Sequence, residues 1–214
     1  MTATISRLYD DYATASQAVT QLERAGIPHS DISIVASNAD NWYSGDRNAG
    51  RDATGRVDRD RDGVDDRAEG AAAGAGMGAA VGGAVGLLAG LGLLAIPGIG
   101  PVVAAGWLIS TAAGAAAGGA TGGIIGALTQ AGVSEEDAHV YAEGVRRGGT
   151  LVTARVPDGD RARVEAILDR SAVSIRDRGA AYRKAGWTGF DAKAPVYTAD
   201  QVRQERERYR KSAA

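Results

Sequence analysis

A long stretch without charged side chains places the strongest constraint on what this chain can fold into. Gly70 to Ser134 contains no Asp, Glu, Lys or Arg, whereas one helical crossing of a bilayer needs only roughly 20 apolar residues. Within it, glycine recurs at every fourth position in two series: Gly74, Gly78, Gly82, Gly86 and Gly90, then Gly114, Gly118, Gly122 and Gly126. Residues four apart share one face of a helix, so each series predicts a helix with a stripe that another helix backbone can approach closely.

The two glycine series are separated by the segment Ala95-Ile96-Pro97-Gly98-Ile99-Gly100-Pro101. Proline inside a helix removes a backbone hydrogen bond and clashes with the preceding turn, so this segment predicts a reversal of the chain. We therefore expect residues 70–132 to form a helical hairpin. An apolar surface of this size is rarely left in water, which favours association of the hairpin with membrane lipid. The alternative is that the glycine stripes pair with each other or with a second copy in a soluble interface.

The two ends of the chain alternate between strand and helix patterns. Residues 1–36 predict β-α-β, with a strand near 4–9, a helix from 12 to 25 and a strand at 31–36. Residues 133–179 predict a helix capped by Ser134, a strand at 150–156, a helix from 161 to 170 and a last strand that begins at Val173. We predict an α+β fold: a small ferredoxin-like split β-α-β sandwich formed by both ends of the chain and interrupted by the helical hairpin.

Two further segments differ in composition. Residues 37–69 form an Asp/Arg-rich stretch that is too polar to bury a core, which predicts a linker. Residues 180–214 form a tail with eight basic and four acidic residues, a net charge of +4. Within it, Thr198 to Gln201 resembles a capping box that starts a charged helix. Glu205 and Glu207 interrupt the basic residues of this helix, so we expect a solvated charged helix. The alternative is that the basic tail, with Trp187, Phe190 and Tyr197, docks on bases or on anionic lipid.

The charge and cysteine content exclude some classes of protein. The 24 basic and 26 acidic residues give a formal net charge of -2, so no general attraction to nucleic acid is indicated. The chain has no cysteine, which excludes disulfides and thiolate chemistry. The first residues lack the pattern of a signal peptide. We expect attachment to the inner membrane through the hairpin, with the α+β domain in the cytoplasm.

One motif in the linker matches a calcium-binding loop. Its ligand positions follow D-x-D-x-D-G-x5-E, a spacing of oxygen ligands that suits Ca²⁺, with Gly63 at the sharp turn. The candidate metal ligands are Asp58, Asp60, Asp62, Val64 through its carbonyl, Asp66 and Glu69. Asp65 stands where an apolar residue normally pairs two such loops, and interleaved arginines reduce the negative charge. The alternative is a solvated low-complexity linker.

No catalytic constellation emerges from the sequence. Gly90 to Ala95 fits G-x-G-x-x-A by letters, but Pro97 follows where a dinucleotide fold needs a long helix. His29 and His139 are the only histidines and are far apart in sequence, so surface positions are expected for both. Glu135, Glu136 and Asp137 suit the first turn of a helix, where its dipole favours acids. We expect no enzyme activity and no small-molecule substrate.

The combined features resemble the general stress protein 17M-like domain family, also called the heat-induced stress protein YflT domain. The resemblance rests on the segments Leu22 to Ile27, Asp31 to Val35, Ile96 to Pro101 and Tyr141 to Gly149. It implies a bacterial stress-associated protein, and it supplies no catalytic residues. The linker at 37–69 departs from the simplest form of the pattern. Our expectation is a non-enzymatic general-stress protein held at the membrane by the hairpin, and the alternative is a soluble self-oligomerising module regulated by Ca²⁺.

Overall fold

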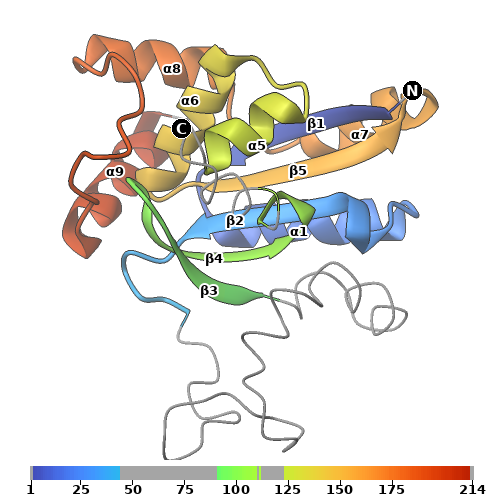
Figure 1. The fold of residues 1–214 in the computed structure, drawn as a ribbon, viewed down its shortest axis with the longest axis horizontal. Helices are drawn as coiled ribbons and strands as arrows, with labels where there is room; N and C mark the ends of the chain where they lie inside the picture. Colours follow the sequence, from blue (N-terminus) through green and yellow to red (C-terminus); the bar gives the residue numbers. More distant parts are fainter. Residues whose placement is uncertain (1, 44–90, 110, 112–122, 213–214) are drawn as a thin grey trace, which may run out of the picture.

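A five-stranded antiparallel sheet forms the centre of the molecule (Figure 1). The structure is a computed structural model, and it describes residues 2–43, 91–109, 111 and 123–212. The strands are β1 (Thr2–Tyr9), β2 (Ile32–Ser37), β3 (Gly92–Ile96), β4 (Gly100–Gly106) and β5 (Thr150–Pro157). They lie in the order β1-β5-β2-β4-β3, and each pair of neighbours is antiparallel. The predicted α+β class is confirmed.

The chain ends form the predicted split β-α-β arrangement. Strands β1 and β2 are joined by helix α1 (Tyr12–Arg24) and lie on either side of β5. After β5, a 3₁₀ turn at Asp158–Asp160 and helix α7 (Arg161–Leu168) lead back to the outer side of β1. There Val173 pairs with Leu8 in an isolated bridge. The β-α-β unit that starts at β5 is therefore split by β1, as a ferredoxin-like fold requires.

Helices cover both faces of the sheet. Helices α1 and α7 pack on one face, where Leu22, Val19 and Leu168 meet Ile34 and Val152. Helices α5 (Ile124–Gln130) and α6 (Glu135–Arg146) pack on the other face. The core there includes Leu8, Val35, Val102, Leu108, Leu128, Ala142, Val145 and Leu151. A 3₁₀ turn at His29–Asp31 leads into β2. Because both faces are covered, β2 and most of β5 are buried along their length.

The predicted helical hairpin is wrong over residues 92–106, which form strands β3 and β4. The two prolines do mark a reversal, but it is a β-turn: Ile99 donates its N–H to the carbonyl of Ile96, and Gly98 adopts φ of 75°. Proline followed by a glycine with positive φ suits a type II turn. The segment forms strands because β4 pairs with β2 and buries Val102 and Val103 in the sheet.

Most of the glycine series lies outside the described residues. Gly74, Gly78, Gly82, Gly86, Gly90, Gly114, Gly118 and Gly122 are in the ranges that the structure leaves out, and Gly126 lies in the seven-residue helix α5. Of the helices that the structure describes, none combines the length and apolar character of a membrane span. The predicted hairpin required two apolar helices on either side of a bend at Pro97 and Pro101. The structure has strands β3 and β4 on either side of this bend instead.

The prediction of a last strand that begins at Val173 is also wrong, because only Val173 pairs with the sheet. Val173 contributes a single bridge, and Ser174 caps helix α8 (Ile175–Lys184) by accepting a hydrogen bond from the N–H of Asp177. The strand ends at this point because Ser174 caps the start of helix α8. This helix is stabilised by the burial of Tyr182.

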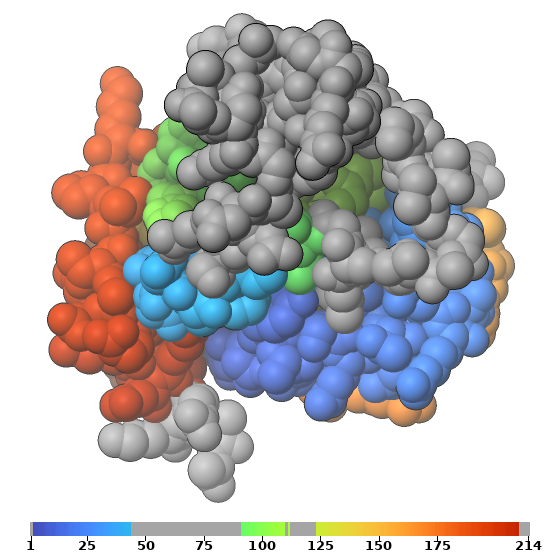
Figure 2. Space-filling view, turned by 90° about the horizontal axis from the view of Figure 1, so that it is seen from below, coloured from blue at the N-terminus to red at the C-terminus, as the bar shows by residue number. Residues whose placement is uncertain are grey.

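Helix α9 (Ala199–Ser212) starts at the predicted capping box. Gln201 donates its N–H to Thr198 Oγ1, and Thr198 donates its N–H to Gln201 Oε1. Much of this helix is exposed, including Arg203, Glu207 and Arg208, as the expectation of a solvated helix requires, whereas Val202 and Glu205 are buried. We call residues 185–212 the C-terminal arm. In Figure 2 the arm forms one side of the molecule, beside the loop that follows β2 and the β3–β4 hairpin.

Candidate interaction site

The outer edge of β3 is the end of the sheet and the most exposed apolar element described (Figure 1). Ala95 pairs with Pro101, which has no N–H, and the carbonyl of Pro101 accepts a hydrogen bond from Asn38 on the β2 side of β4. The Ala95–Pro101 pair is therefore a non-hydrogen-bonded one. It follows that Leu93 and Ala95 direct their N–H and C=O groups away from β4, while Leu94 directs its own towards β4.

Strand β3 itself carries no charged residue, proline or bulge of the kind that often protects the end of a sheet. Charged residues, proline or bulges normally prevent an edge strand from pairing with another chain. No residue from Leu91 to Gly106 is charged, and β3 itself contains no proline or bulge. Leu93 is 46% exposed. No described residue donates to, or accepts from, the outward backbone groups of Leu93 and Ala95.

The opposite edge of the sheet, strand β1, is partly occupied by contrast. The carbonyl of Ser6 accepts hydrogen bonds from Tyr141 Oη at 2.7 Å and from the Arg7 guanidinium at 2.9 Å. The carbonyl of Leu8 accepts from the N–H of Val173 at 2.8 Å. Arg7 also forms an ion pair with Asp169. The two ends of the sheet therefore differ in their capacity to accept a further strand.

An ordered aromatic loop fixes the start of β3. The Asn38 side chain binds the backbone of Tyr43 twice, at 2.9 and 3.0 Å, and the Tyr43 hydroxyl donates to the carbonyl of Leu91 at 3.3 Å. Trp42 is 39% exposed, and its ring centroid lies 4.6 Å from that of Tyr12. The loop positions the outward carbonyl of Leu91 and places aromatic surface next to the edge of β3.

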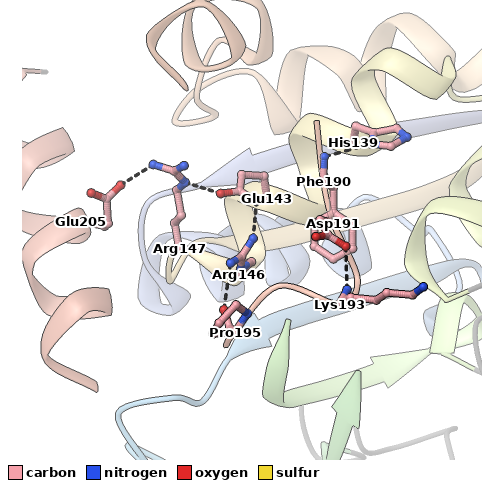
Figure 3. A network of polar contacts seen from close by, with 9 residues as sticks. All are labelled: His139, Glu143, Arg146, Arg147, Phe190, Asp191, Lys193, Pro195 and Glu205. Carbon is pink, nitrogen blue, oxygen red and sulfur yellow. Dashed lines mark hydrogen bonds and ion pairs between the residues drawn. The ribbon is translucent and has the colours of Figure 1, made fainter. Parts of the chain in front are cut away.

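A buried network of charges attaches the C-terminal arm to α6 (Figure 3). Glu143 is 0% exposed, and its carboxylate binds Arg146 at 3.3 Å and Arg147 at 2.6 Å. Arg147 continues to Glu205 on α9 at 3.0 Å, and its guanidinium lies 4.3 Å from the centre of the Tyr182 ring. Such a network holds the arm because each buried charge has a partner of opposite sign.

The arm in turn packs on the turn of the β3–β4 hairpin. A Cβ at Gly98 would lie 2.5 Å from Ala192 Cα, and one at Gly100 would lie 3.3 Å from Val196. Nearby, the N–H of Phe190 donates to His139 Nδ1 at 3.1 Å, and Arg146 donates to the carbonyl of Pro195 (Figure 3). Glycine is required at position 98 both for its positive φ and for this close approach. The arm therefore holds the hairpin against α6.

Burial changes the ionisation of groups around this framework. Burial raises the pKa of Tyr141 from 10.0 to about 12. Burial alone would lower the pKa of Arg147, but the hydrogen bond and the charge of Glu143 raise it above its ordinary value. These groups keep their neutral and charged forms, respectively, at neutral pH and act as structural contacts.

The metal ligands predicted from the sequence, Asp58, Asp60, Asp62, Val64, Asp66 and Glu69, lie outside the described residues. Within residues 2–43, 91–109 and 123–212, no group of three or more potential ligand side chains is placed to hold a metal ion. His29 and His139 are partly exposed. The acids at 135–137 start α6 as predicted, since Ser134 accepts from the N–H of Asp137.

The sequence does not predict the exposed edge of β3, because it places Leu93 in the first helix of the hairpin and Ala95 in the break between the two helices. The signal that could have revealed it is the pair Pro97-Gly98 between short apolar runs, which is typical of a turn between two strands.

Comparison of the chain with models of protein families, with curated proteins and with solved structures gives no match.

Proposed function

We propose that this chain is a non-enzymatic protein that acts by self-association through the free edge of β3. The observation that carries the proposal is the pair of residues Leu93 and Ala95, whose outward N–H and C=O groups have no partner among the described residues. Such groups form the template for strand addition. The lack of charge from Leu91 to Gly106 supports pairing with an identical segment, because no like charges would meet.

Light scattering after size-exclusion chromatography without detergent tests this function. We expect the mass of the unmodified chain to rise with concentration towards that of an oligomer. Ala95→Pro removes the outward N–H without removing a hydrogen bond to β4, and proline is tolerated in an edge strand, so this variant should give single chains. Ala95→Ser, which keeps the N–H, is the matched control and should behave like the unmodified chain. A mass equal to one chain at every concentration would refute the proposal.

The other expectations from the sequence stand as separate proposals. The resemblance to the stress protein family supports a role in the bacterial stress response. Membrane attachment now depends on residues 70–90, which are uncharged and precede β3. Cell fractionation tests attachment: the proposal predicts the protein in the membrane fraction, and recovery wholly in the supernatant would refute it.

A further inference from the structure

We propose that two copies of the chain join by antiparallel pairing of their β3 strands about a two-fold axis at Leu94. This inference rests on the proposed self-association and names its partner and register. In this register Leu93 lies opposite Ala95 of the second copy, and Leu94 lies opposite Leu94. Because Leu93 and Ala95 direct their polar backbone groups outward, each Leu93–Ala95 pair exchanges both N–H···O bonds across the axis. The two five-stranded sheets become continuous.

The side chains suit this register. Successive residues of a strand face opposite sides of the sheet, so Leu93 and Ala95 share one face. There the large Leu93 side chain, which is 46% exposed, lies against the small side chain of Ala95. On the other face Leu94 packs against the core formed with α6, and the two Leu94 side chains meet at the axis and extend that core.

The difference between the two edges of the sheet favours a closed dimer. If β3 of one copy paired with β1 of the next, the contact would repeat indefinitely and give filaments. If the β3 strands of two copies pair with each other, both exposed β3 edges are covered and the assembly closes. The outward carbonyls of Ser6 and Leu8 on β1 are already bonded to Tyr141 and Val173. Strand β1 therefore offers β3 fewer free acceptors than a second β3 does.

The length of β3 sets the expected strength of the dimer. A stable protein interface buries about 1,200–2,000 Å² in total, which a pair of five-residue strands does not reach by backbone contact alone. We therefore expect a dimer that dissociates on dilution.

Cysteine cross-linking tests the register, since the chain has no cysteine of its own. In Leu94→Cys, the two thiols face each other in a non-hydrogen-bonded pair, with Cα atoms about 4.5 Å apart, within the range that a disulfide spans. Oxidation of the full chain should give a covalent dimer on a non-reducing gel. Leu93→Cys alone is the control: its thiols are diagonal neighbours about 7–8 Å apart, so cross-linking should be roughly tenfold slower.

A second pair of variants covers the case in which Leu94→Cys disturbs the core. Leu93 and Ala95 are both exposed, and chains with Leu93→Cys mixed with mass-tagged chains with Ala95→Cys should form a tagged–untagged disulfide. If the unmodified chain dimerises by light scattering but neither experiment yields these products, β3 is not the interface and this inference is overturned. If the unmodified chain is a single chain at every concentration, the proposed function fails with it.

Discussion

Glu143 and Arg147 lie one turn apart on α6, with Oε1 and Nε 2.6 Å apart and the Glu143 side chain fully buried. Arg147 extends this contact to Glu205 on α9 at 3.0 Å. We predict that Glu143→Gln lowers the free energy of unfolding by about 3 kcal/mol, because Arg146 loses its carboxylate partner and Arg147 keeps only Glu205. Urea denaturation measures the loss. The control is Glu165→Gln, which breaks an exposed Arg161–Glu165 pair of the same spacing and should cost less than about 0.5 kcal/mol. Equal losses would contradict a structural role for the buried network.

The close approach of the C-terminal arm to the β-turn makes Gly98 a sensitive position. Gly98 and Gly186 both have positive φ, 75° and 89°, but only Gly98 has backbone within reach, with Ala192 Cα 2.5 Å from the place of a Cβ. Gly186→Ala should cost about 1 kcal/mol for the backbone conformation alone. Gly98→Ala should cost about 2 kcal/mol more, because the arm must move, and proteolysis within residues 185–198 should become faster. Similar behaviour of the two variants would show that the arm does not pack on the turn.

The buried hydroxyl of Tyr141 predicts a loss of stability at high pH. Burial raises its pKa from 10.0 to about 12 in the folded protein, so the folded state holds its proton more tightly than the unfolded state. The stability from this group is complete below pH 10 and is lost as the pH rises from 10 to 12. Tyr141→Phe should reduce the slope of unfolding free energy against pH in that window. An unchanged slope would mean that Tyr141 ionises as easily in the folded protein as in the unfolded one.

The calcium loop is a prediction from the sequence alone. Titration of the full chain with Ca²⁺ in a calorimeter should give saturable heat, since the oxygen ligands from Asp58 to Glu69 follow the required spacing. Glu69→Gln removes the bidentate ligand and should abolish the heat. The control, Glu207→Gln, makes the same change in the arm and should have no effect. Absence of saturable heat at millimolar Ca²⁺ would leave residues 58–69 as a polar linker.

The parts of the fold with local signals were predicted correctly from the sequence. Strand β5 forms where Thr150 to Val156 predicts a strand, α6 begins at the Ser134 cap, and α9 begins at the box from Thr198 to Gln201. The strands β3 and β4 were not, because alanine, glycine and leucine runs suit either helix or strand. The pairing of β4 with β2, for example of Val102 with Ser37, favours the strand. This pairing joins residues that are far apart in sequence.

The candidate site was hidden from the sequence for the same reason. The outward direction of the Ala95 backbone follows from its pairing with Pro101 and from the hydrogen bond between Asn38 and Pro101. Neither contact has a local signature. The buried network around Glu143 likewise includes a distant residue: Glu205, in a helix for which charge alone predicts exposure to solvent, pairs with Arg147.

Amide hydrogen exchange along β3, followed by NMR at low protein concentration, tests the central claim most directly. The account predicts alternation: the Leu94 amide is protected by β4, while the outward amides of Leu93 and Ala95 exchange quickly. Those two amides should become protected as the concentration rises and β3 strands pair. Uniform protection of residues 92–106 at every concentration, as a continuous helix would give, would contradict the account.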